Sequence, residues 1–177
     1  VYSSIPITLD ETLESLANCD YSPPASRLAQ LSDLSAGDYQ IFIKAWNTLS
    51  SARRYEVIVK LAEIADAEVK YNFDAVFKTS LTDEDETIRL KSIAGLWEND
   101  EEWLAEKLLK LLQKDQSTKV RIAAAQALEP FCLKAELDNT AAANKHKLEK
   151  GLISVFNNAG ENTELRRRAI EAVSPLN

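Results

Sequence analysis

The chain has little of what most catalytic and metal-binding sites require. Its 177 residues include four glycines, five prolines, two cysteines, one histidine and no methionine. The glycines are isolated from one another, so they form no glycine-rich phosphate-binding loop. The one histidine, His146, has no Cys, Asp or Glu at metal-ligand spacing, and it belongs to no specific Ser-His or Cys-His nucleophile set. We therefore expect no enzymatic activity, no cofactor and no bound metal.

The sequence also has no long hydrophobic run and no repeated cysteine spacing. No apolar segment approaches the roughly 18–20 residues that a membrane span needs. Cys19 and Cys132 lie far apart, which favours two small buried side chains over a disulfide framework or a zinc site. Free thiols fit a reducing compartment, so we expect a cytoplasmic protein. The chain begins at Val1 without a signal-peptide pattern, which indicates a processed N-terminus or a fragment.

The remaining composition favours packed helices with an acidic surface. Apolar residues make up 45% and aromatic residues 7%, which is typical of a helical core built from Leu and Ala. The net charge is −7, with 17 acidic against 9 basic residues in positions 1–100 and 11 against 12 in positions 101–177. Nucleic-acid binders need clustered Lys and Arg. Nucleic acid is therefore an unlikely partner for this chain.

Three segments of the chain align without gaps, which indicates an internal repeat. Each has an aliphatic residue followed by an arginine, with apolar residues four and seven places after that arginine. The segments are Asp83 to Leu96, Asp115 to Leu128 and Gly160 to Val173. A weaker fourth copy is centred on Arg54, preceded by Arg53 in place of an aliphatic residue.

The spacing of the repeat predicts pairs of helices. The four arginines are separated by 35, 32 and 45 residues, roughly the period of two-helix solenoid units. An amphipathic stretch precedes each arginine, so each repeat predicts a helix A, a short turn and a helix B. The predicted A helices are Tyr39–Leu49, Val69–Leu81, Glu102–Leu112 and Lys145–Phe156. The long third interval predicts an insertion around residues 135–144.

The first 37 residues predict a divergent helical pair that caps the repeats. Thr8 and Glu11 have the spacing of a capping box at a helix start. Two prolines, at positions 23 and 24, should end that helix, and a second helix is predicted over Ala25–Leu34. The domain prediction is therefore a cap over 1–37 and four helix pairs over 38–177, forming one continuous solenoid.

The repeated pattern resembles the second helix of HEAT repeats. The best match is Asp115 to Leu128, and the resemblance covers roughly residues 38–177. It implies an all-α, right-handed solenoid of antiparallel helix pairs with about ten helices. It further implies a structural ladder between repeats, carried by Asp and Arg side chains at matching positions, which are Asp83, Arg89, Asp115 and Arg121.

A stripe of apolar residues lies outside the core positions of the predicted B helices. Residues one, five and eight places after the arginine share a face, separate from the face that packs in the core. If the B helices line the concave side, as the resemblance implies, this stripe faces a groove. The residues are Tyr55, Val59, Leu90, Ala94, Trp97 and Ile122. They are either a partner-binding surface or partly buried between helices.

These features favour a non-catalytic scaffold that binds a protein or peptide partner. Two alternatives within similar helical-repeat families are a phycobilin-lyase-like subunit and a nucleic-acid-binding protein of the DNA-alkylation-repair type. The first lacks a recognisable chromophore-handling set of residues in this chain. The second needs a basic surface, and the only basic cluster is 166–168.

Overall fold

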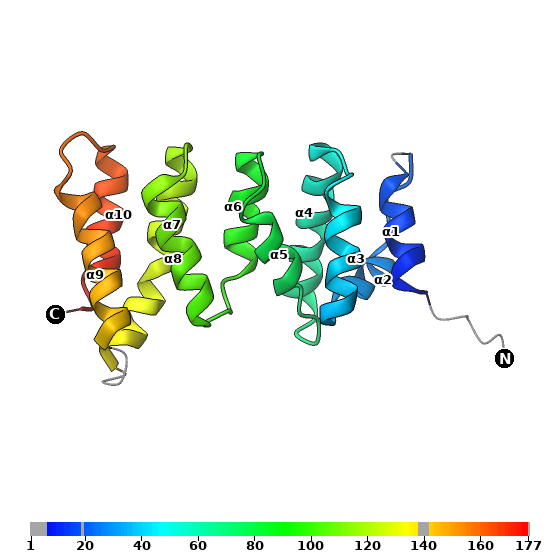
Figure 1. The fold of residues 1–177 in the computed structure, drawn as a ribbon, viewed down its shortest axis with the longest axis horizontal. Coiled ribbons are helices and arrows are strands. Elements are labelled where there is room, and N and C mark those ends of the chain that lie inside the picture. The colour runs from blue at the N-terminus through cyan, green and yellow to red at the C-terminus, as the bar shows by residue number, and fades with distance from the viewer. Residues whose placement is uncertain (1–6, 19, 138–141, 177) are drawn as a thin grey trace. The chain divides into compact units, whose positions relative to one another are not determined.

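The computed structural model describes residues 7–18, 20–137 and 142–176, and within these ranges the protein is all-helical, without a strand (Figure 1). Cys19 and part of the predicted insertion, residues 138–141, lie outside the described residues. The helices are α1 (Leu9–Ala17), α2 (Ala25–Leu28), the 3-10 turn η1 (Ala29–Leu31), α3 (Ala36–Trp46), α4 (Ser51–Ala67), α5 (Asp74–Ser80), α6 (Glu86–Gly95), α7 (Glu102–Lys114), α8 (Thr118–Leu137), α9 (Ala142–Asn157) and α10 (Thr163–Val173). The ten α-helices agree with the number that the repeat predicts.

Side chains at the helix starts explain where several helices begin. Thr8 and Glu11 form the predicted capping box: the Glu11 N–H donates to Thr8 Oγ at 3.2 Å, and the Thr8 N–H donates to the Glu11 carboxylate at 2.9 Å. Ser35 caps α3, Ser50 caps α4 and Asp85 caps α6, each through a side-chain oxygen that accepts a hydrogen bond from a backbone N–H of the first turn. These caps satisfy N–H groups that have no partner inside the helix.

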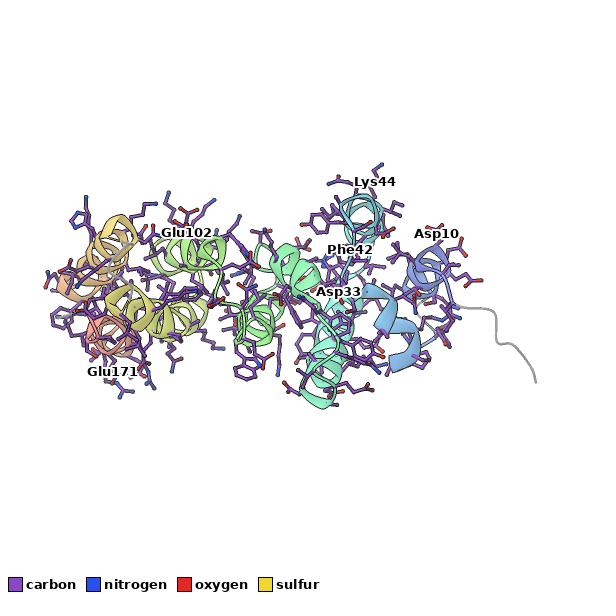
Figure 2. The ribbon with its side chains drawn as sticks, turned by 90° about the horizontal axis from the view of Figure 1, so that it is seen from below. Asp10, Asp33, Phe42, Lys44, Glu102 and Glu171 are labelled. Atoms are coloured by element: carbon purple, nitrogen blue, oxygen red, sulfur yellow. The ribbon has the colours of Figure 1, made fainter. Side chains whose placement is uncertain are left out.

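The chain divides into two compact units, Val1–Leu96 and Trp97–Asn177. In the first unit α4 packs against both α2 and α6, α5 packs against α6, and α1 packs against α3. Its core holds large fully buried side chains from each pair, including Leu16, Phe42, Ile58, Phe77 and Ile88. In Figure 2, Phe42 of α3 points toward the body of the unit, and Lys44 points away from it.

In the second unit α8 packs against α7, α9 and α10, most extensively against α7 and α10. The connections within the pairs are short, from Lys114 to Thr118 and from Asn157 to Thr163. Packed helices joined by so few residues run antiparallel. Glu102 of α7 and Glu171 of α10 lie on opposite sides of the unit, which has two layers of helices (Figure 2).

Helix α8 is longer than the repeat predicts. The repeat pattern ends at Leu128, yet the helix continues to Leu137 with Pro130 in its interior. Proline has no N–H to donate to the carbonyl four residues earlier, so Pro130 would ordinarily mark the end of a helix. Buried Phe131, Cys132 and Ala135 hold the last turns of α8 against its neighbours. Their burial accounts for the continuation of the helix beyond the proline.

No helix in the described ranges is both long and apolar enough to cross a membrane.

Candidate interaction surface

The core positions of the B helices keep the same spacing from the repeated arginine in every copy. In the repeats of α4, α6 and α8, the residue before the arginine and those four and seven places after it are buried. In α10 the corresponding residues Leu165 and Val173 are buried, and Ile170 is half-buried. Arg53 is buried at such a position, where its guanidinium donates to the Glu56 carboxylate at 2.7 Å and to the Asn18 carbonyl. The helical register that the sequence predicts for these helices is therefore the observed one.

In the first unit, four apolar residues lie outside these core positions on α4 and α6. Tyr55 is 39% exposed, Ala94 is exposed, and Val59 and Leu90 are half-buried. Because α4 and α6 pack against each other, the four residues belong to neighbouring helices of one layer. We call Tyr55, Val59, Leu90 and Ala94 the α4–α6 patch.

Trp97 directly follows this segment of the chain and is 71% exposed. A tryptophan side chain carries a large apolar area, so leaving it in water has a considerable cost in free energy. Packing within the described residues covers little of the Trp97 side chain, whereas Trp46 is buried in the core.

In the second unit, the face of α8 that holds the predicted residue Ile122 carries two exposed leucines further along, beyond the polar residues Gln126 and Glu129. Ile122 is half-buried, and Leu133 and Leu137 are 50% and 75% exposed. Residues three or four places apart share a helix face, and the steps from Ile122 through Gln126 and Glu129 lead to Leu133 and Leu137. We call Ile122, Leu133 and Leu137 the α8 stripe. The repeat pattern did not indicate these two leucines, because the aligned segment ends at Leu128.

The family model for the HEAT repeat matches residues 104–135, a segment that runs from α7 through most of α8. The match includes Asp115 and Arg121, two of the positions on which the resemblance rested.

Residues 104–135 form a HEAT repeat.

No curated protein matches the chain. HEAT repeats are helical repeats that often mediate protein interaction. The matched segment includes Ile122 and Leu133 of the α8 stripe, on the second helix of the pair α7–α8.

The repeated arginines form two links from a B helix to an acid in the following repeat. Arg54 of α4 donates from Nε to Asp83 Oδ2 at 2.6 Å and from Nη2 to Asp83 Oδ1 at 3.1 Å. Arg121 of α8 donates to both carboxylate oxygens of Glu161, at 2.8 and 2.6 Å. Hydrogen bonding to Asp83 is the main cause that raises the pKa of Arg54. The ladder acid of the last repeat is therefore Glu161, one residue after the Gly160 that the alignment places there.

The same arginines also hold the helix before them. Arg54 donates to the Leu49 carbonyl, Arg121 to the Leu112 carbonyl and Arg166 to the Phe156 carbonyl. Each of these carbonyls lies at or near the C-terminal end of a helix A, where the last four carbonyls have no helical partner. Arg89 donates to the carbonyls of Asp83 and Glu84, and Asp115 accepts from the Ser117 N–H at 2.8 Å.

The basic cluster of α10 is engaged by acids of the same helix. Arg167 pairs with Glu164 at 2.7 Å and with Glu171 at 3.2 Å, and Arg168 pairs with the same two acids at 2.8 and 3.1 Å. Hydrogen bonding to Arg167 is the main cause that lowers the pKa of Glu164. Two arginines opposite two glutamates present little net positive charge to a phosphate backbone.

Cys132 and His146 differ in their exposure to solvent. Burial raises the pKa of the Cys132 thiol to about 12, so the nucleophilic thiolate is scarcely populated at neutral pH. His146 is exposed on α9. Among the residues that the structure describes, no three His, Cys, Asp or Glu side chains are grouped to hold a metal ion.

Proposed function

We propose that this protein is a non-catalytic HEAT-repeat scaffold that binds a protein partner through the exposed apolar side chains of its B helices. The α4–α6 patch, Trp97 and the α8 stripe supply these side chains. The arrangement proposed for the repeats is a right-handed solenoid, in which B helices line the concave side.

The exposure of Trp97, Leu133 and Leu137 is the observation that carries the proposal. Large apolar side chains gathered on a protein surface mark interaction sites more often than chance. Tryptophan and tyrosine are enriched among the residues that contribute most to binding, because they bury a large rigid area. Trp97 and Tyr55 are accordingly the proposed anchors, each within its own unit, and Leu90 and the α8 stripe supply further apolar contacts.

Two observations support a protein rather than a nucleic acid as the partner. The net charge is −7, and the two arginines Arg167 and Arg168 pair with glutamates of their own helix. The chain therefore presents exposed apolar side chains on a protein with a net negative charge. Such a surface fits a partner with an apolar face and basic flanks, because opposite charges around an interface favour association.

Three variants of the full chain test the proposal. Leu90→Glu and Trp97→Ala alter the proposed surface, and Ile41→Glu is the matched control because Ile41 is 46% exposed on α3, outside the B helices. The source organism's lysate provides the partner, and the captured protein is then titrated against each variant. Truncating a central aromatic anchor typically costs about 2 kcal/mol or more, which is roughly a thirtyfold loss of affinity.

We expect Trp97→Ala and Leu90→Glu to weaken binding with melting temperatures close to the native value, and Ile41→Glu to bind normally. If both surface variants lose their thermal stability, the side chains serve packing and the proposal is wrong. It is also wrong if capture is equally strong with all three variants. Binding to heparin or DNA at low salt would instead favour the nucleic-acid alternative.

A further inference from the structure

A cleft in the second unit lies between α7, α8 and α9. Its volume is about 220 Å³, and its apolar lining comes from all three helices: Ala105 and Leu109 of α7, Phe131 and Ala135 of α8, and Leu148 of α9. The side chains on α8 that line it, Phe131, Lys134 and Ala135, differ from those of the α8 stripe. The cleft is therefore separate from the proposed interaction surface.

The size of the cleft limits what it can hold. A cavity of about 150 Å³ accommodates one benzene ring, whereas pockets for drug-sized ligands have volumes of about 300–1,000 Å³. At about 220 Å³ the cleft fits one large apolar side chain. It is too small for a nucleotide or a tetrapyrrole.

Charged side chains surround the apolar lining, and acids outnumber bases among them. Lys134 donates to the Asp100 carboxylate at 2.5 Å, and Lys147 lies 3.3 Å from the Glu106 carboxylate. Glu102 adds a third carboxylate to the rim. The hydrogen bond from Lys134 lowers the pKa of Asp100, so this carboxylate is ionised at neutral pH.

The two ion pairs at the rim are open to solvent. All four side chains are more than half exposed, and exposed pairs of this kind contribute little to stability. A cationic ligand could therefore replace either lysine beside its carboxylate at little cost. An anionic ligand would meet three carboxylates against two lysines.

We propose that this cleft binds a peptide segment of a partner protein in which one large apolar residue is flanked by basic residues. The apolar side chain enters between Leu109, Phe131 and Leu148. The flanking Lys or Arg side chains pair with Glu102 and with the carboxylates of Asp100 and Glu106. This inference is independent of the proposed interaction surface on the B helices.

Three blocked pentapeptides probe the cleft of the full-length chain: Gly-Lys-Trp-Lys-Gly, the same peptide with Glu in place of both Lys residues, and the same peptide with Ala in place of Trp. Binding is measured by NMR from the methyl signals of Leu109, Ala135 and Leu148. We expect saturable shifts with the first peptide. At low ionic strength, where charges are screened least, the Glu peptide should bind at least about fivefold more weakly, and the Ala peptide should produce no saturation.

Three variants locate the binding. Ala135→Leu fills the cleft and should abolish the shifts of the remaining methyl groups, with folding checked by circular dichroism. Glu102→Lys changes only the exposed rim, so it tests the cleft even if Ala135→Leu does not fold. It should weaken binding of the Lys peptide and strengthen binding of the Glu peptide. Leu133→Glu is the matched control on the opposite face of α8 and should bind as the native chain does.

The inference is overturned if the Lys peptide produces no saturable shift, or if the Glu peptide binds equally well. It is also overturned if folded Ala135→Leu binds like the native protein. Loss of binding in Leu133→Glu would move the peptide site to the α8 stripe and would contradict the cleft as well.

Discussion

Removing the carboxylate of Asp83 should destabilise the first unit strongly. The Asp83 side chain is only 4% exposed, and it accepts two hydrogen bonds from Arg54 and one from the Asp85 N–H at 3.0 Å. In Asp83→Ala, the buried guanidinium of Arg54 loses its main counter-charge. Breaking a buried ion pair by removing one partner typically costs about 3–5 kcal/mol.

The structure places the expected cost at the lower end of that range. Arg54 retains its hydrogen bond to the Leu49 carbonyl at 2.6 Å and its contact with Glu84 at 3.2 Å. The Glu84 side chain is 83% exposed, so solvent screens its charge. We expect a loss of about 3 kcal/mol in the free energy of unfolding. For a unit the size of Val1–Leu96, this corresponds to a decrease of roughly 12–24 °C in melting temperature.

A double-mutant cycle measured by urea unfolding separates the pair from its surroundings. Asp83→Ala, Arg54→Ala and the double variant should give a coupling energy of about 2 kcal/mol or more. Glu68→Ala is the control, because Glu68 pairs with Lys70 on the surface, and its loss should cost less than about 1 kcal/mol. A coupling below about 0.5 kcal/mol, the limit for independent sites, would refute the structural role of the Arg54–Asp83 link.

Three further predictions concern single side chains. Hydrogen bonds from Thr87 and Ser51 hold the pKa of Asp85 at about 2, below its ordinary value of 3.8. Its carboxylate therefore stabilises the fold above about pH 4 and loses that effect as the pH falls toward 2. The difference in unfolding free energy between the native chain and Asp85→Asn should narrow over that range. Gly95→Ala should destabilise the protein by about 1–3 kcal/mol in urea unfolding, because a Cβ there would lie 2.6 Å from the ring of buried Phe77; a stability equal to that of the native chain would show that the ring can move. Cys132 should resist iodoacetamide at pH 8 in the folded protein and react in denaturant, as judged by peptide mass mapping, since burial raises its pKa to about 12; rapid labelling of the native protein would contradict its burial.

The sequence predicted the core register of the B helices well, because that register depends on a local pattern. Two helix bounds were wrong: α5 begins at Asp74 and not at Val69, and the helix predicted over Ala25–Leu34 is the short α2 followed by η1, which ends at Leu31. Thr8 and Glu11 define the start of α1, and the residues around Arg89 and Arg121 identify which face of α6 and α8 is buried. The shared pattern depends on helical periodicity alone, so it can be recognised without any knowledge of the neighbours.

The features that the sequence did not predict depend on tertiary contacts. Glu161 replaces the expected aspartate because its carboxylate reaches Arg121 from the turn before α10, 40 residues away. Leu133 and Leu137 extend the apolar stripe because contacts of Phe131 and Ala135 maintain α8 beyond Pro130. The cleft between α7, α8 and α9 depends on three segments separated along the chain, and no local pattern indicates it.

The most direct test of the proposed scaffold is site-specific photo-crosslinking to the captured partner. A benzophenone side chain is placed at Tyr55, at Trp97 or at the control position Ile41, all of which are exposed. The proposed function predicts strong crosslinks to one partner protein from positions 55 and 97 and none from position 41. Crosslinks from position 41 alone, or equal crosslinks from all three positions, would contradict binding through the B helices.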